Sequence, residues 1–238
     1  MFDYATQSRV TDPGRFTDRL SEIPGDLRQM RAAARQLVFH YRAGGDYAEN
    51  GIDPGRIAEI DTRYARDMLA RIFELADRPL TGKRAPSERI VGCCRDFTVL
   101  FLAMARQHGV PARARVGFAT YFVPGWFLDH VIAEVWDTGQ QRWRLIRGWF
   151  QVRHNLIQDL ASLAMNEMLL WDDWGLGLVD GELAPEQLAL LDALAAATCS
   201  SEVSDETIAS FYQREEFRVP PVVTSFSPAR GAPLQVAV

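Results

Sequence analysis

The feature that most constrains the fold is a helix-forming segment that begins at Cys94 and is followed by three strand-forming segments. Over residues 94–108, apolar residues recur at the spacing of one helical face, and Gly109-Val110-Pro111 ends the pattern. One helix followed by three strands predicts an α+β fold, in which a buried helix packs against an antiparallel sheet. The strand-forming segments cover residues 112–122, 130–136 and 142–146.

The second and third strand-forming segments are joined by residues typical of a tight turn. Asp137-Thr138-Gly139 follows Trp136 directly, and the alternating segment 142–146 begins soon after it. We therefore expect these two strands to form an antiparallel hairpin.

Helical segments flank this core on both sides. Apolar stripes with helical spacing predict helices over residues 26–41 and 56–76 before the core. After the core, similar stripes predict helices over residues 155–165 and 185–197, and the tail from Val219 onward is expected to be extended. The core is thus expected to have helical N- and C-terminal flanks.

The composition fits one globular domain. Of the 238 residues, 47% are hydrophobic, which is enough to bury a sizeable core and excludes an intrinsically disordered chain. We expect a single domain over residues 1–238, in which 1–88 form a helical part and 89–147 the core. Residues 148–238 are expected to form a second helical part with the extended tail.

Charge and hydropathy exclude two classes of partner. The formal net charge of −5 argues against nucleic acid, which binds basic surfaces. No apolar run is long enough to span a membrane, and the residues after Met1 lack the basic and apolar regions of a secretory signal. A cytoplasmic protein without a membrane partner is expected.

The number and placement of the cysteines and histidines argue against a disulfide framework and a zinc site. Three cysteines are too few and too unevenly placed for a disulfide framework, and the four histidines show no zinc-ligand spacing. We therefore expect no metal and no organic cofactor, and a thiol of functional importance would act as a nucleophile.

Cys94 and His130 have the placement that a cysteine acyl-transfer enzyme requires. A thiol at a helix N-terminus gains from the helix dipole and from free backbone N–H groups, which stabilise a thiolate. Cys94 opens the predicted buried helix, and His130 opens a strand, from which an imidazole can take and return a proton. Such a pair needs a third group to orient the imidazole.

Three short motifs carry a resemblance to a known family. They are Gly92-Cys93-Cys94-Arg95-Asp96-Phe97, Gly109-Val110-Pro111-Ala112-Arg113, and Asp129-His130-Val131 with Glu134-Val135-Trp136. In this order they resemble the core of the transglutaminase-like superfamily, and more narrowly bacterial proteins with a transglutaminase domain. The resemblance implies a papain-like fold, Cys94 as nucleophile, His130 as acid/base and Cys93 as the variable position of the motif.

The third catalytic residue of the family has no counterpart here. The family has an Asp at the end of the next strand, where this sequence has Arg147 after Ile146. The abrupt join at this point suggests that a segment carrying the Asp is missing. No other carboxylate is a convincing substitute from the sequence, and those considered are Asp96, Asp129, Glu134, Asp137, Asp159, Asp172 and Asp173.

The resemblance leads to one functional hypothesis and two alternatives. The hypothesis is cysteine-dependent acyl transfer on an amide, by hydrolysis or transamidation, through a thioester at Cys94. The first alternative is a non-catalytic binding or scaffold protein, because Arg147 replaces the expected Asp. The second is redox sensing by Cys93 and Cys94 without dependence on His130.

An aromatic segment before His130 is the candidate substrate wall. Tyr121 and Trp126 in this segment would line a substrate groove and exclude water. The alternative is that the segment is a hydrophobic loop packed on the C-terminal helices. The expected partner is a peptide, protein or small amide substrate. The sequence does not predict the oligomeric state.

Overall fold

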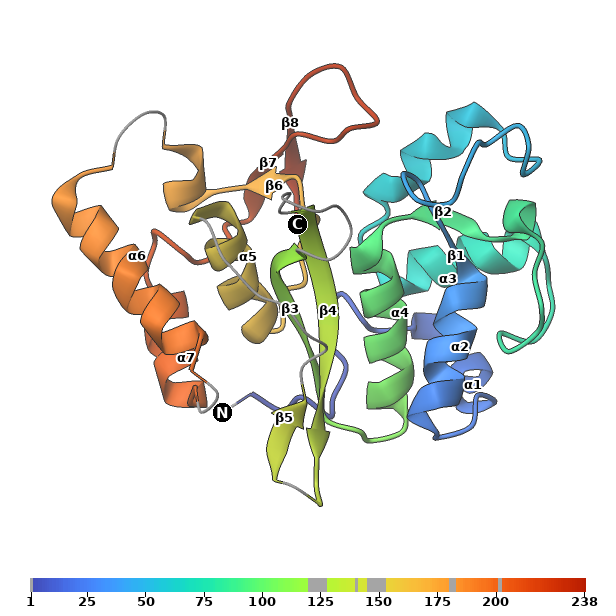
Figure 1. Cartoon of the computed structure of the whole chain (residues 1–238), viewed down its shortest axis with the longest axis horizontal. Coiled ribbons are helices and arrows are strands. Elements are labelled where there is room, and N and C mark those ends of the chain that lie inside the picture. The colour runs from blue at the N-terminus through green and yellow to red at the C-terminus, as the bar shows by residue number, and fades with distance from the viewer. Residues whose placement is uncertain (1, 120–127, 140, 145–152, 180–182, 201–202) are drawn as a thin grey trace. The chain divides into compact units, whose positions relative to one another are not determined.

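The computed structural model describes residues 2–119, 128–139, 141–144, 153–179, 183–200 and 203–238 (Figure 1). It divides the chain into an N-terminal unit, Tyr4–Ala112, and a C-terminal unit, Arg113–Val238, which also includes the first residues of the chain. Helices combine with mainly antiparallel strands, which confirms the predicted α+β class. Among the described residues, no helix has both the length and the apolar character needed to cross a bilayer.

The N-terminal unit is a helical cluster around one buried helix. Its elements are η1 (Gly14–Phe16), α1 (Thr17–Ser21), α2 (Leu27–Leu37), β1 (Val38–His40), η2 (Pro54–Asp61), α3 (Ala65–Leu75), η3 (Pro86–Glu88), β2 (Ile90–Gly92) and α4 (Cys94–Gln107), where η denotes a 3-10 helix.

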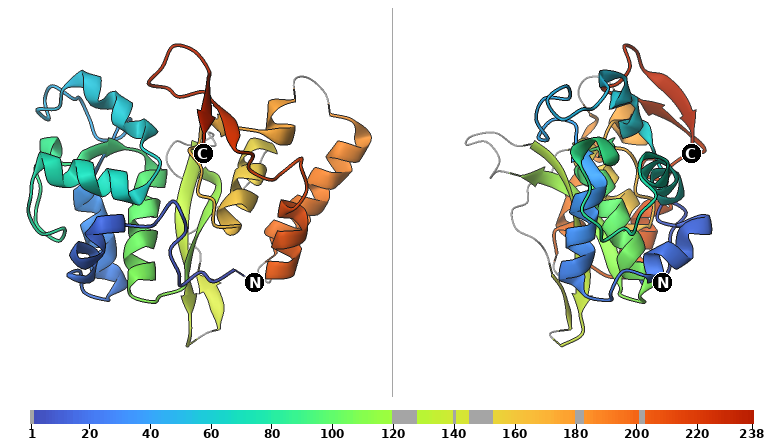
Figure 2. Two further views of the ribbon diagram at one scale, coloured as in Figure 1. Left: turned by 180° about the vertical axis from the view of Figure 1, so that it is seen from behind. Right: turned by 90° about the vertical axis from the view of Figure 1, so that its right-hand side faces the viewer.

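Helix α4 is the centre of this unit, and it begins at the predicted residue, Cys94. Its side chains Val99, Leu100, Leu102 and Met104 are fully buried. Helices α1, α2 and α3 all contact α4, and α2 runs alongside it in both views of Figure 2. The apolar stripe read from the sequence is therefore the surface on which the N-terminal unit packs.

The predicted helix over residues 26–41 is wrong over its last residues. Helix α2 begins after Asp26, whose side chain accepts hydrogen bonds from the amides of the next turn, but it ends at Leu37. Val38 then turns to extended geometry, and β1 pairs in parallel with β2, with His40 opposite Gly92. The β-branched and aromatic side chains of β1 suit a strand once a partner is available.

The predicted helix over residues 56–76 is interrupted. Residues up to Asp61 form the 3-10 helix η2, and α3 starts only at Ala65. At the break, the carbonyl groups of Thr62 and Arg63 accept hydrogen bonds from the guanidinium of Arg95, at 3.4 and 2.7 Å. A continuous helix would have used both carbonyls internally, so the break supplies acceptors for a buried cation.

Gly92 is required by close packing at the junction of β2 and α4. A Cβ atom on Gly92 would lie 2.6 Å from a carboxylate oxygen of Asp96 and 2.9 Å from a methyl carbon of Val38. Both neighbours are themselves fixed, Asp96 by a hydrogen bond and Val38 by the β1–β2 ladder. A side chain at this position therefore displaces either the start of α4 or β1.

Among its described residues, the C-terminal unit contains two small sheets, three α-helices and the 3-10 helix η4. Its elements are β3 (Ala112–Ala119), β4 (Leu128–Asp137), β5 (Arg142–Arg144), α5 (Arg153–Leu163), β6 (Asp172–Asp173), η4 (Gly175–Leu178), α6 (Pro185–Thr198), α7 (Asp205–Tyr212), β7 (Val222–Ser225) and β8 (Leu234–Ala237), with β3 starting at the boundary between the units.

The sheet of β3, β4 and β5 contains the predicted hairpin. Strands β4 and β5 pair antiparallel, with Trp136 opposite Trp143, which confirms the expected pairing. The extended tail is also confirmed, because β7 and β8 form a second hairpin that pairs with β6.

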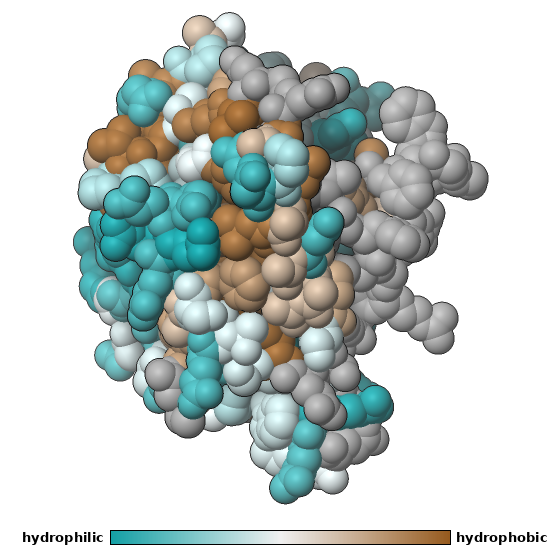
Figure 3. Space-filling view, turned by 90° about the vertical axis from the view of Figure 1, so that its left-hand side faces the viewer, coloured by the Kyte–Doolittle hydropathy of each residue, from teal (hydrophilic) through white to brown (hydrophobic). Residues whose placement is uncertain are grey.

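Helix α6 keeps an apolar outer surface, on which Leu188 is 50% exposed. Figure 3 views the molecule from the side of α6 and shows hydrophobic surface, in brown, among hydrophilic regions in teal.

A buried ionic network joins the elements of the C-terminal unit. The guanidinium of Arg115 on β3 binds the Asp159 carboxylate on α5 at 2.9 Å and the Thr198 carbonyl at the end of α6 at 2.8 Å. It also lies 3.5 Å from Glu134 on β4, which accepts a 2.7 Å hydrogen bond from Arg113. Four elements therefore share one set of compensated buried charges.

We expect Gly92→Ala to lower the free energy of unfolding by about 1–3 kcal/mol, because the added methyl group overpacks the β2–α4 junction. Urea unfolding followed by circular dichroism measures the change. Gly231→Ala is the matched control, since a Cβ there meets nothing within 4 Å. Equal unfolding midpoints for Gly92→Ala and the wild type would contradict the packing described here.

We expect Arg115→Ala to lower the free energy of unfolding by about 3–5 kcal/mol, because it leaves two buried carboxylates without their shared cation. Arg214→Ala is the control, because Arg214 pairs with Glu216 on the surface and its loss should cost less than about 1 kcal/mol. Urea unfolding compares the two variants, and a similar cost for both would show that the buried network is not stabilising.

Candidate active site

Cys94 occupies the first position of α4, at the positive end of the helix dipole. It is partly exposed, whereas its neighbour Cys93 is only 3% exposed, and neither is in a disulfide. Cys93 is the N-cap residue and has extended backbone geometry. The helix start therefore presents one accessible thiol in the field of the helix dipole and hides the other.

Asp96 and Arg95 hold this helix start in place. The Asp96 carboxylate accepts a 2.7 Å hydrogen bond from the Cys93 amide, and its other oxygen lies 3.2 Å from the Arg95 guanidinium. Arg95 also reaches the two carbonyls at the break before α3, and both side chains are buried. Arg95 is thus a structural cation at the start of α4.

The groups around Cys93 keep its thiol protonated. A hydrogen bond to Cys94, burial and the Asp96 carboxylate all raise the pKa of Cys93 well above its usual range. Cys93 therefore keeps its proton, which it can donate toward the Cys94 sulfur. Burial raises the pKa of Asp96 to about 6, although Arg95 and the Cys93 amide oppose this effect.

His40, the last residue of β1, and Tyr41, which follows it, also lie at the start of α4. The His40 ring stacks against Phe97, one turn after Cys94, with centroids 6.4 Å apart, and against Tyr41 at 5.6 Å. The sequence analysis missed both residues. They are distant from Cys94 along the chain, and only the parallel pairing of β1 with β2 brings them near it.

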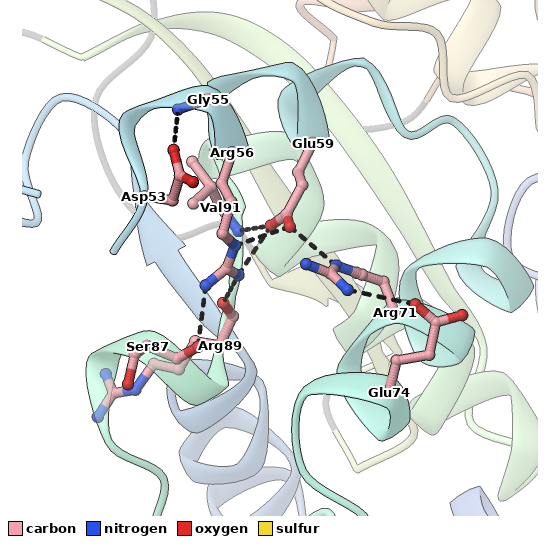
Figure 4. A network of polar contacts seen from close by, with 9 residues as sticks. All are labelled: Asp53, Gly55, Arg56, Glu59, Arg71, Glu74, Ser87, Arg89 and Val91. Carbon is pink, nitrogen blue, oxygen red and sulfur yellow. Dashed lines mark hydrogen bonds and ion pairs between the residues drawn. The ribbon is translucent and has the colours of Figure 1, made fainter. Parts of the chain in front are cut away.

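A second ionic network supports the strand that leads to the cysteines (Figure 4). The Glu59 carboxylate accepts hydrogen bonds from Arg56, from Arg71 at 2.9 Å and from the Val91 amide at 2.8 Å. Burial opposes ionisation of Glu59, but these donors outweigh it and lower the pKa of this carboxyl. Arg56 also donates to the carbonyl of Arg89, so η2 is fastened to β2.

His130 lies near the start of β4 in the C-terminal unit and is partly exposed. Cys94 belongs to the N-terminal unit, and each residue is described within its own unit. The Cys94–His130 pair therefore stays a prediction.

The carboxylates considered as a third catalytic group have other partners. Glu134 and Asp159 belong to the buried Arg115 network. Asp172 is fully buried and accepts a 3.1 Å hydrogen bond from the Leu169 amide. These three carboxylates stabilise the fold of the C-terminal unit.

The N-terminal end of α5 carries a polar cluster that the sequence analysis missed. Asn155 donates to the Gly117 carbonyl at 3.2 Å and to Asp129, the neighbour of His130, at 3.4 Å. Next to it, His154 lies 3.5 Å from Asp173. Burial opposes the imidazolium form, but Asp173 and the Leu170 carbonyl outweigh it and raise the pKa of His154.

Several predicted features lie outside the described residues. These include the candidate substrate wall with Tyr121 and Trp126, and the junction at Ile146 and Arg147. Among the residues that the structure describes, no group of three or more His, Cys, Asp or Glu side chains is arranged to hold a metal ion.

Comparisons with known proteins bear on the predicted family. Residues 73–152 match the model of the transglutaminase-like superfamily, and the predicted core over 89–147 lies inside this match. None of the curated proteins matches the chain. A solved structure of a provisionally assigned cysteine protease from Cytophaga hutchinsonii is similar at 16% identity, with a TM-score of 0.37.

That similarity covers 59% of this chain and 38% of the Cytophaga protein, so the chain spans well under half of the length of that relative. The family match is independent of it and includes both Cys94 and His130. At residues 73–152, the chain therefore contains a domain of the transglutaminase-like superfamily.

Proposed function

We propose that this protein catalyses cysteine-dependent acyl transfer on an amide, with Cys94 as nucleophile and His130 as general acid/base. The observation that carries the proposal is the partly exposed Cys94 thiol at the N-terminus of a buried helix, within a transglutaminase-like domain. The substrate would be a peptide, a protein side chain or a small amide.

The proposed reaction has two halves. The Cys94 thiolate attacks the amide carbonyl, and the tetrahedral oxyanion collapses to a thioester while His130 protonates the leaving amine. Water or a second amine, deprotonated by His130, then attacks the thioester and releases Cys94. Hydrolysis and transamidation differ only in which of these nucleophiles reaches the thioester.

The geometry around Cys94 supports the first half. The dipole at the N-terminus of α4 favours both the thiolate and the oxyanion, and buried Arg95 adds a positive charge at the same end of the helix. Cys93, which keeps its proton, is a further donor beside the sulfur. These groups act without a metal ion or an organic cofactor.

A specific sequence observation favours one alternative function. Arg147 stands where the family pattern has the Asp that orients the histidine. Loss of this residue from a Ser-His-Asp triad costs about four orders of magnitude in turnover. A non-catalytic binding or scaffold protein is therefore the second candidate, and the reactivity of Cys94 distinguishes it from an enzyme.

We expect iodoacetamide to alkylate Cys94 rapidly below pH 7, because an ion-paired thiol titrates below the usual thiol pKa of about 8.5. Intact-mass and peptide mass spectrometry locate the label. Cys199 is an internal reference, because burial raises the pKa of its thiol and it should react slowly at neutral pH.

Two histidine variants complete this test. His130→Ala should return the pH profile of Cys94 to that of an ordinary thiol, whereas His154→Ala, at another partly buried histidine of the C-terminal unit, should leave it unchanged. A wild-type Cys94 that reacts only as the pH approaches about 8.5 would exclude the enzyme and support the scaffold.

We expect Asp96→Asn to lower the apparent pKa of Cys94 by about one pH unit, because it removes a negative charge and keeps the positive charge of Arg95. Since Asp96 has a pKa of about 6, its carboxylate is ionised at pH 7. The effect on the alkylation rate should be present at pH 7 and fade as the pH falls below 6.

Asp53→Asn is the matched control for this variant. Asp53 caps η2 through a 2.7 Å hydrogen bond from the Gly55 amide and has no described contact with the cysteines. Its substitution should leave the pH profile of Cys94 alkylation unchanged. A higher apparent pKa for Cys94 in Asp96→Asn would contradict the assigned repulsion between carboxylate and thiolate.

A further inference from the structure

Tyr41 is the residue near Cys94 that has no role in the mechanism so far. Its amide donates a 2.9 Å hydrogen bond to the carbonyl of Gly92, two residues before Cys94. Its ring stacks on His40, which in turn stacks on Phe97, one turn along the helix that Cys94 opens. Backbone and ring contacts therefore fix Tyr41 at the start of α4.

The turn that carries Tyr41 is itself well fixed. The His40 Nδ1 atom accepts hydrogen bonds from the Arg42 and Ala43 amides, at 3.2 and 3.1 Å. The Gly44 amide then donates to the His40 carbonyl at 2.7 Å. These contacts close the turn directly after β1, so Tyr41 is preorganised rather than part of a loose loop.

The hydroxyl group of Tyr41 is suited to bind a ligand. Tyr41 is partly exposed, and its phenolic hydroxyl carries a proton that it can donate to an acceptor. Burial raises the pKa of Tyr41, Arg42 opposes this effect, and the nearby Cys93 and Cys94 sulfurs raise it further. The hydroxyl thus stays protonated at neutral pH and lies within the electrostatic reach of both thiols.

We propose that the Tyr41 hydroxyl binds the carbonyl oxygen of the acyl group attacked by Cys94, as a side-chain donor beside the backbone amides at the start of α4. This inference rests on the proposed function. When the thiolate forms its bond to the carbonyl carbon, the π electron pair moves to the oxygen. The Tyr41 O–H stabilises that oxyanion until the pair returns and the leaving group departs with its bonding electrons.

The role assigned to Tyr41 differs from that of Arg95 and Cys93. Those two residues act on the sulfur before the substrate arrives, whereas an oxyanion donor acts only on a carbonyl oxygen. A reagent that reacts with the same sulfur without forming an oxyanion should therefore react at the same rate whether or not the Tyr41 hydroxyl is present. This distinction defines the experiment.

The experiment compares two reagents on the full-length protein at pH 7. p-Nitrophenyl acetate acylates Cys94 through a tetrahedral oxyanion and releases p-nitrophenolate, whereas iodoacetamide alkylates the same sulfur by displacement at a saturated carbon. The variant is Tyr41→Phe, which keeps the ring. Tyr47→Phe, in the segment that follows the turn, is the matched control, and its hydroxyl has no hydrogen-bond partner among the described residues.

We expect Tyr41→Phe to slow acylation of Cys94 by about 100- to 1,000-fold, the usual effect of losing one oxyanion donor. Its alkylation rate and pH profile should stay within about twofold of the wild type, as should both rates in Tyr47→Phe. Thermal unfolding of each variant checks that the fold is retained.

The other outcomes are distinct. Equal acylation by Tyr41→Phe and the wild type would overturn the role of Tyr41 and leave the proposed function intact. Slowing of both reactions to the same extent would also overturn it, because Tyr41 would then act on the sulfur or on the fold. A wild-type protein that neither reagent labels at Cys94 at pH 7 would overturn the proposed function, and the inference with it.

Discussion

The hydrogen bond from the Cys93 amide to the Asp96 carboxylate is the contact on which the candidate site depends. It fixes where α4 begins, and Cys94 is the next residue. The same carboxylate needs the bare backbone of Gly92 beside it and the Arg95 guanidinium against its other oxygen. The motif Gly-Cys-Cys-Arg-Asp is therefore one packing unit, in which only the second cysteine faces a substrate under the proposed function.

The influence of that unit extends into the rest of the N-terminal unit. Arg95 needs carbonyl acceptors, and the break between η2 and α3 supplies them at Thr62 and Arg63. The Glu59 network binds η2 to β2, so the strand before the cysteines is held from its other side. Each buried charge thus has partners close by, and its ion pairs and hydrogen bonds offset the free-energy cost of removing it from water.

The elements that the sequence predicted correctly are those whose signals lie within the element itself. The helical spacing after Cys94 and the Asp-Thr-Gly turn before β5 need no distant partner, and both elements are confirmed. Strand β1 was missed because Val38 continues the apolar stripe of α2, and its partner β2 is remote in sequence. For the same reason, no pattern indicated that Tyr41 lies near the start of α4. The pairing with His130 is still a prediction.

The two units use their carboxylates differently, and this bears on the absent third residue of the motif. In the C-terminal unit, Glu134 and Asp159 are paired with Arg115 in a buried network. In the N-terminal unit, the helix start, Arg95 and the proton on Cys93 all favour negative charge on Cys94. A thiolate stabilised in this way needs less help from an oriented histidine than a serine would. Under the proposed function, the first half of the reaction therefore depends mainly on the N-terminal unit, and loss of the Asp at position 147 weakens the proton transfers more than the attack itself.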